Sequence, residues 1–397
     1  MIFNYNFSKL EKNYLFSDIQ NKVNKYEKNH SDLPAISLSI GDVTLPLCTA
    51  STNAMRQAID EMKHTKTFKG YGPEQGYEFL RDKIKNDYRK LGVTINLEEI
   101  FINDGSKSDL GNIMDIFSQP QRALIPNPVY PAYVDTNKIN GNEILFINST
   151  EKNNFLPLPD QNCHVDIIYI CSPNNPTGSV YNKSQLQEWV NFALDTGAII
   201  LFDAAYRDFI DNPTLPRSIF EIDNAKKVAI EFCSFSKNAG FTGIRCGYTI
   251  IPQQIKSGEY SANSLWARRQ SAKFNGVSYI TQKGAAAIYS SEGQKEIQNN
   301  ISYYKRNAML IKEFFLPYSK KIFGGENSPY IWLLCPFGMN SWEFFDFLLN
   351  GAGIVGTPGI GFGENGKNFF RFSAFCNKSD LDIALKRMSL LFEKYRE

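Results

Sequence analysis

Histidine is scarce in this chain, with three residues among 397, at positions 30, 64 and 164. Imidazoles so few and so far apart do not match the ligand spacing of a zinc site or supply the base of a serine-type triad. We interpret all three as structural or exposed. The sequence therefore predicts no metal site and no histidine-based hydrolase.

Paired cysteines are also missing from the sequence pattern. The chain has seven cysteines, an odd number, and no two of them stand in a C-x-x-C spacing. Free thiols in a reducing compartment are the simplest explanation, which predicts a cytoplasmic location.

Long apolar runs and an excess of one charge are absent as well. No run approaches the roughly 18 apolar residues that a membrane span requires, and the first residues lack the pattern of a secretory signal. The 43 basic and 41 acidic residues nearly balance, leaving a formal charge of +2. We therefore expect neither a membrane nor a nucleic acid as a partner.

What the chain does contain is a regular alternation of apolar runs and helix-like stretches between residues 41 and 284. This alternation predicts an α/β fold, with a mainly parallel central sheet covered by helices on both faces. Because 397 residues exceed one typical core, we expect a second, smaller α/β domain from residues 1–40 and 285–397. The expected strands of the large domain are 100–102, 123–125, 167–171, 198–202, 228–231 and 248–251. In the small domain we expect a helix over 291–315 and strands around 330–334 and 369–373.

The most informative stretch is Ser-Phe-Ser-Lys at 234–237, followed by Arg245. A lysine flanked by small hydroxyl residues, with an arginine eight positions on, suits an enzyme that holds pyridoxal 5'-phosphate as an imine. Lys237 would form the imine, while Ser234, Ser236 and Arg245 would hold the phosphate. Taken alone, a single lysine among 43 basic residues is far more often a solvated surface charge, so the other segments decide the interpretation.

Two predicted strands end in polar residues that fit the same site. Asp203 closes the run 198–203, and Tyr206 follows three residues later. Ligands of open α/β sheets lie at the carboxyl ends of strands, so Asp203 could pair with the nitrogen of a bound pyridine ring. Asn175 stands in the Pro- and Gly-rich turn after the run 165–171, where its amide could reach the phenolic oxygen. The alternatives are a helix-capping aspartate and a plain turn.

Three further segments add candidate residues. A strand, a glycine turn and a helix start at 100–109 would place Ser106 and Lys107 around a phosphate, unless this is an ordinary capped helix. Tyr130 lies in a proline-rigid loop and could stack on a planar ring, although most aromatic residues must be core. Arg371 interrupts an apolar strand, so its guanidinium needs an anion, either a substrate carboxylate or a structural partner.

Together these residues resemble the fold type I, class I and II pyridoxal-phosphate-dependent aminotransferases. Within them the chain is similar to the LL-diaminopimelate aminotransferase family from Asn13 to the C-terminal helix. Longer segments carry this closer resemblance: 13–16, 40–42 with 45–47, 70–76, 273–279, 324–332 and 356–363.

The resemblance implies a role for each candidate around the cofactor. Lys237 is the catalytic residue, as the Schiff-base lysine and the base that moves a proton between the substrate Cα and the cofactor. Tyr130 stacks on the ring, and Asp203 pairs with its nitrogen. Asn175 and Tyr206 bind the phenolic oxygen. The phosphate is surrounded by donors from both subunits of a homodimer, with Tyr71 from the neighbour: Tyr71, Ser106, Lys107, Ser234, Ser236 and Arg245.

The resemblance also implies the substrate contacts. Arg371 and the Gly41 backbone would hold the α-carboxylate, next to Tyr130 and Asn175. The far end of the substrate would be read by Tyr14, Glu74, Lys107 and Asn275, with Glu74 and Asn275 donated by the partner subunit. The implied reaction interconverts LL-2,6-diaminopimelate and 2-oxoglutarate with L-tetrahydrodipicolinate, glutamate and water, in the biosynthesis of lysine.

Two alternatives stay open at this point. A related aminotransferase acting on lysine, aromatic or other amino acids would share every cofactor residue. A non-enzymatic pyridoxal-phosphate-binding regulator would carry a basic helix-turn-helix extension, which this sequence lacks, and would have little use for both Lys237 and Arg371.

Overall fold

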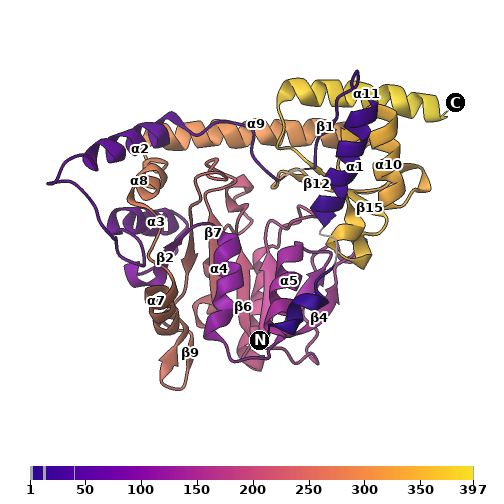
Figure 1. Cartoon of the computed structure of the whole chain (residues 1–397). Helices are drawn as coiled ribbons and strands as arrows, with labels where there is room; N and C mark the ends of the chain where they lie inside the picture. Colours follow the sequence, from indigo (N-terminus) through magenta and orange to yellow (C-terminus); the bar gives the residue numbers. More distant parts are fainter. Residues whose placement is uncertain (1–2, 12–14, 40, 397) are drawn as a thin grey trace.

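The computed structural model describes residues 3–11, 15–39 and 41–396, and Figure 1 shows the arrangement of its elements. Within these ranges the largest sheet has seven strands in the order β2-β8-β7-β6-β5-β3-β4. Strand β8 runs antiparallel to β2 and β7, and the other neighbouring pairs are parallel. The predicted α/β fold with a mainly parallel sheet is therefore confirmed. The strands are β2 (Ile100–Asn103), β3 (Arg122–Asn127), β4 (Glu143–Asn148), β5 (Ile167–Cys171), β6 (Ile199–Asp203), β7 (Ala229–Ser234) and β8 (Gly247–Ile250).

The central strands are apolar throughout because both faces of the sheet are covered. In β5, Ile168 and Ile170 belong to one core cluster, whereas Ile167 and Tyr169 belong to another. Successive side chains of a strand point to opposite faces, so an unbroken apolar run fills two cores at once. The sheet therefore lies between two layers of helices.

The two layers differ in their helices. Helices α3 (Glu78–Lys90) and α6 (Lys183–Thr196) contribute to the first cluster, and α4 (Ser106–Asn112) and α5 (Pro131–Asn140) contribute to the second. Helix α6 begins with a capping box formed by Asn182 and Gln185, and it ends at Gly197, which has a left-handed φ of 76°. Both signals are local, which is why such boundaries can be predicted from sequence.

A smaller sheet with its own core is built from the C-terminal part of the chain. Its strand order is β11-β12-β15-β14, and its paired strands are antiparallel. Its bounds are β11 (Ile322–Gly324), β12 (Tyr330–Leu334), β14 (Thr357–Pro358) and β15 (Phe369–Ser373). Around this core lie α1 (Leu15–Asn29), α9 (Ser291–Phe315), α10 (Ser341–Ala352) and α11 (Lys378–Arg396).

Segments from both parts of the chain meet in this smaller unit, although the described residues before α1 do not: Asn4 and Asn6 donate to the Ile139 carbonyl of α5 in the large unit. The short strand β1 (Ile36–Ser37) pairs in parallel with β13 (Ile354–Val355). Helix α9 runs along the top of the molecule in Figure 1, from α2 (Thr49–Glu61) and α8 (Tyr279–Ala287) toward α11. The domain limits, 41–284 for the large domain and 1–40 with 285–397 for the small one, stay a prediction.

Most predicted elements are present with small shifts of their ends. The helix 291–315 and the strands 330–334 and 369–373 match α9, β12 and β15. Strand β4 was not predicted; it lies at the end of the sheet and its side chains are only partly buried. In the part of the chain that the structure describes, no helix is both long and apolar enough to cross a lipid bilayer.

Sheet direction explains where polar residues gather. The parallel strands β3, β5, β6 and β7 end at the same edge, and β2 ends there too because β8 is antiparallel to both β2 and β7. Segments far apart in sequence therefore meet at this edge, which is where ligands of such sheets bind.

Candidate active site

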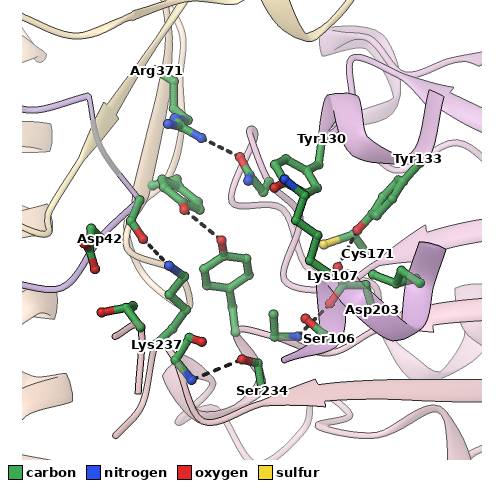
Figure 2. A pocket seen from close by; sticks show the side chains of 18 of the residues that line it. Asp42, Ser106, Lys107, Tyr130, Tyr133, Cys171, Asp203, Ser234, Lys237 and Arg371 are labelled. Carbon is green, nitrogen blue, oxygen red and sulfur yellow. Dashed lines mark hydrogen bonds between the residues drawn. The ribbon is translucent and has the colours of Figure 1, made fainter. Parts of the chain in front are cut away.

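A cavity of about 390 Å³ lies at this edge, between the central sheet and the smaller one. In Figure 2 its labelled side chains surround a common space, with Arg371 at the top and Ser234 at the bottom. Most of the residues predicted from the sequence line it: Gly41, Ser106, Lys107, Tyr130, Asn175, Asp203, Tyr206, Ser234, Ser236, Lys237, Arg245 and Arg371.

Hydroxyl and guanidinium donors gather in the lower part of the cavity. Arg245 Nη1 donates to Ser236 Oγ at 3.2 Å, and the Ser236 amide donates to Ser234 Oγ at 3.1 Å. Ser106 and Lys107 begin α4, where the backbone amides have no partner within the helix. This set of donors suits a compact dianion such as a phosphate group.

Gly105 gives Arg245 room to enter this donor cluster. The φ of Gly105 is +122°, and a Cβ at this position would lie 2.1 Å from Arg245 Nη2. Its amide donates to Asn103 Oδ1 at 2.9 Å, which fixes the turn before α4. Only glycine satisfies both the backbone conformation and the close approach.

We expect Gly105→Ala to lower the free energy of unfolding by about 1–2 kcal/mol, because alanine is strained at positive φ. We also expect weaker binding of a phosphate-bearing ligand, since Arg245 must move. Chemical denaturation and ligand titration measure the two effects. Gly197→Ala is the matched control: Gly197 also has positive φ, 76°, but a Cβ there meets nothing within 4 Å. If both variants bind phosphate equally well, Gly105 has no role in the donor cluster.

Asp203 supplies a buried carboxylate to the cavity. Tyr133 Oη donates to Asp203 Oδ2 at 2.6 Å, and the Ala205 amide donates to Oδ1 at 3.1 Å. Burial raises the pKa of Asp203, while these two hydrogen bonds act in the opposite direction. A cation placed beside the carboxylate would restore its negative charge, so this position suits a protonated ring nitrogen.

Two hydrogen bonds join the central sheet to the smaller sheet across the cavity. The hydroxyls of Tyr206 and Tyr330 are 2.7 Å apart. Arg371 Nη1 donates to Asn175 Oδ1 at 2.7 Å, and Arg371 Nη2 donates to the Ser39 carbonyl at 2.6 Å. Because Asn175 Oδ1 accepts from Arg371, its amide group is oriented with Nδ2 as the remaining donor.

Lys237 places a primary amine in the cavity. Its Nζ donates to the Gly41 carbonyl and lies 5.8 Å from the centre of the Phe375 ring. Burial lowers the pKa of Lys237 from 10.5 to about 8, although Asp42 raises it in part. An amine with such a pKa can both give and accept a proton near neutral pH.

This pKa predicts how the reactivity of the free amine depends on pH. With no ligand bound, we expect the rate of modification of Lys237 by an amine-reactive acylating reagent to rise with pH, with a midpoint near the pKa of about 8. A midpoint near 10.5, the ordinary lysine value, would contradict the burial of the amine. Since the folded pKa is the lower one, the unfolded chain binds more protons between these values, and this group's contribution to stability rises with pH across that window.

Of the predicted residues that the structure describes, three do not line the cavity in this chain. Tyr71 is 91 % exposed, and Glu74 and Asn275 are exposed as well. Glu74 and Asn275 lie on touching loops, because a Cβ on Gly276 would be 3.1 Å from the Pro73 carbonyl and 3.8 Å from Glu74 Cα. Tyr14 lies outside the described residues. Nothing within one chain assigns the three exposed residues to the cavity, and their donation to a partner subunit stays a prediction.

Sequence reasoning missed two tyrosines that line the cavity, Tyr133 and Tyr330. Tyr133 follows Tyr130 by one helical turn, and this spacing could have placed it beside the same ligand. Tyr330 had no comparable signal, because its partner Tyr206 is 124 residues away in sequence.

The side chains present fit one kind of ligand. A flat ring could lie against Tyr130, with Asp203 beside a ring nitrogen, the donor cluster around an anionic group and Lys237 within reach. In the described parts of the chain no group of three or more His, Cys, Asp or Glu residues has metal-binding geometry. The donor set therefore suits a phosphorylated pyridine.

Comparisons with known proteins agree with this geometry. The chain is 49% identical to the LL-diaminopimelate aminotransferase of Azobacteroides pseudotrichonymphae, over 98% of both sequences. It is 48% identical to that of Lawsonia intracellularis, over 97% of this chain and 98% of the relative. The solved structure of L,L-diaminopimelate aminotransferase from Chlamydomonas reinhardtii superposes with a TM-score of 0.92 at 38% identity, covering 98% of each chain. The model of the family described as "Aminotransferase class I and II" matches residues 34–388. With a match over most of its length, this chain belongs to the class I and II aminotransferases.

Proposed function

We propose that this chain is an LL-diaminopimelate aminotransferase that uses pyridoxal 5'-phosphate. The observation that carries the proposal is the arrangement of Lys237, Asp203 and the Arg245 donor cluster around one cavity. Relatives 47–49% identical over almost the whole chain, all with that activity as their name, support the choice of substrate.

The family depends in general on pyridoxal 5'-phosphate. In this chain the cofactor would be held by Lys237, with Asp203 at its ring nitrogen and Tyr130 against its ring. Asn175 and Tyr206 would hold its phenolic oxygen. Its phosphate would lie in the donor cluster of Ser106, Lys107, Ser234, Ser236 and Arg245. When bound, the cofactor supplies an electron sink for the bonds of an amino-acid Cα.

The chain's own residues then orient the substrate and move a proton. Arg371 would hold the α-carboxylate with its planar guanidinium, the group that matches carboxylate geometry best. The Lys237 amine would take the proton from Cα, a task that its lowered pKa suits. Asp203 would keep a negative charge beside the ring nitrogen, and burial strengthens that interaction because little water screens it.

We propose that the far end of the substrate is read across a two-fold homodimer. Tyr71, Glu74 and Asn275 are exposed side chains near one another in sequence or on touching loops, which fits a surface that completes a partner's cavity. Lys107 and Tyr14 would take part from the same subunit as the cofactor. The seven cysteines are all free thiols, which supports a cytoplasmic location as part of the proposal.

Substitution of Glu74 tests whether this residue binds the far end of the substrate. Diaminopimelate has an ammonium group there, whereas glutamate has a carboxylate alone. We expect Glu74→Gln to lower kcat/KM for LL-diaminopimelate by about tenfold or more while glutamate changes little, since charge-assisted hydrogen bonds are worth about 1.5–3 kcal/mol. Equal losses for both substrates would remove this role. Glu78→Gln, at an exposed carboxylate four residues on, is the matched control.

The proposed activity is tested by substrate profiling. Purified protein with pyridoxal 5'-phosphate is given 2-oxoglutarate and one amino donor, and glutamate formation is measured. Donors to compare are LL-diaminopimelate, meso-diaminopimelate, lysine and aromatic amino acids. Clear preference for the LL isomer supports the proposal, and equal or faster reaction of lysine or aromatic donors contradicts it. In the biosynthetic direction, glutamate should aminate L-2,3,4,5-tetrahydrodipicolinate.

A further inference from the structure

Tyr330 occupies an unusual place between the two sheets. It is the first residue of β12 in the smaller sheet, and its side chain is 1% exposed. Tyr206 follows β6 of the central sheet, and the two rings meet edge to face with centres 5.1 Å apart. Backbone pairing of Tyr330 with Ser373 of β15 fixes its position. Tyr330 is therefore a rigid neighbour of a residue that would bind the cofactor.

The two hydroxyls share one hydrogen bond, 2.7 Å between the oxygens. Burial raises the pKa of both Tyr206 and Tyr330, so each hydroxyl keeps its proton at neutral pH. Only one of the two protons can lie between the oxygens. The direction of this bond therefore decides whether the proton of Tyr206 points at Tyr330 or into the cavity.

Arg371 favours one direction. Its guanidinium carbon lies 4.5 Å from the centre of the Tyr330 ring. A nearby positive charge makes a hydroxyl a better donor and a poorer acceptor, and it favours an O–H dipole whose proton points away from the cation. The Tyr330 proton then lies on Tyr206, and the Tyr206 proton is left for an acceptor in the cavity.

We propose that Tyr330 is a positioning residue that donates its hydroxyl proton to Tyr206 and so directs the Tyr206 O–H toward the phenolic oxygen of the cofactor. This inference rests on the proposed function. The two hydroxyls form a short chain in which each bond polarises the next, so the Tyr206 donor is stronger with Tyr330 behind it. Through these two successive hydrogen bonds Tyr330, a residue of the smaller sheet, affects the cofactor without contacting its phenolic oxygen.

A second contact allows the position of the Tyr330 hydroxyl to be tested without any cofactor. A Cβ on Gly41 would lie 2.8 Å from Tyr330 Oη but 3.9 Å from Cζ. Gly41→Ala should therefore destabilise the chain with Tyr330 present and be better tolerated together with Tyr330→Phe. The Gly41 carbonyl also accepts from Lys237, so Gly41 lies beside both the Tyr330 hydroxyl and the catalytic amine.

The test is Tyr330→Phe, which removes the hydroxyl and keeps the ring beneath Arg371. We expect pyridoxal 5'-phosphate to bind the ligand-free variant about three- to tenfold more weakly, the size of one lost hydrogen bond. The pH at which the absorption spectrum of the bound cofactor changes should rise. A weaker hydrogen bond from Tyr206 leaves more negative charge on the phenolic oxygen, which then holds the neighbouring proton more tightly. Tyr206→Phe should show the same change, and adding Tyr330→Phe to it should add little.

Tyr181→Phe is the control, since this buried hydroxyl donates to the Pro157 carbonyl away from the cavity. Stability losses shared by both variants are then separated from effects on the cofactor. The inference is overturned if folded Tyr330→Phe binds and titrates like the wild type, or if its effect adds in full to that of Tyr206→Phe. A wild type that does not bind pyridoxal 5'-phosphate would overturn both the proposed function and this inference. A wild type that binds it and transfers amino groups, beside an unchanged Tyr330→Phe, overturns the inference alone.

Discussion

Lys237→Ala is expected to lower kcat by at least about 10²- to 10⁴-fold, the usual contribution of a positioned acid–base group. The amine lies in the cavity, donates to the Gly41 carbonyl and has a pKa lowered to about 8 by burial. Alanine leaves no group there that can carry a proton to or from the substrate. Steady-state kinetics with glutamate as the amino donor measure the loss, and circular dichroism checks that the variant folds.

Two comparisons make this result specific. Lys107→Ala also removes a cavity lysine, but we expect a larger change in KM than in kcat, because Lys107 is assigned to binding. Lys312→Ala removes a lysine that pairs with Glu326 outside the cavity, and it should leave both constants unchanged. A small primary amine added to Lys237→Ala should restore part of the rate by replacing the missing base. If Lys237→Ala keeps more than a tenth of the wild-type kcat, Lys237 is not the catalytic base.

Asp203→Asn is expected to lower kcat by about 10²- to 10⁴-fold, since removing one partner of a buried ion pair costs about 3–5 kcal/mol. Asparagine is nearly the same size, and its one oxygen can still accept from the Ala205 amide while its Nδ2 faces the Tyr133 hydroxyl, whose oxygen can accept in turn. What it lacks is the negative charge that would keep the ring nitrogen protonated. Single-turnover kinetics of the amino-acid half-reaction isolate this effect from product release.

Tyr133→Phe separates charge from orientation at this carboxylate. It removes one hydrogen bond to Asp203 and leaves the charge, so the expected loss in kcat is about tenfold or less. Asp203→Asn should therefore be the more severe of the two. Equal losses would mean that hydrogen-bond geometry, and not charge, is what Asp203 contributes.

Site residues whose role follows from their neighbours in sequence could be predicted. Asp203 ends an apolar strand, and every ligand-binding residue at such an end must meet the other parallel strands at one edge. Ser234, Ser236 and Lys237 share one loop, so their proximity needs no knowledge of the rest of the chain. Gly105 follows a strand and precedes a helix, which indicates a turn where the backbone approaches a ligand.

Residues whose role depends on distant partners were not predictable in the same way. Tyr330 reads as an ordinary aromatic strand residue until the smaller sheet is placed against Tyr206. Arg371 was expected to bind an anion, but only the structure shows that it also orients Asn175 and lies over the Tyr330 ring. No local pattern carries such contacts, because they form when two separate cores pack together.

The sequence by itself determined the mainly parallel α/β sheet and the chemical types present at its edge. Hydrophobic periodicity and strand-end residues act over a few positions, so they can be read without the fold. Tertiary structure alone decided that Lys237 donates to Gly41, that Tyr133 holds Asp203 and that two hydrogen bonds join the sheets across the cavity. These contacts set the burial that lowers the Lys237 pKa and raises that of Asp203. The physical reason is that desolvation and hydrogen-bond direction depend on everything around a group in space, which neighbours in sequence do not specify.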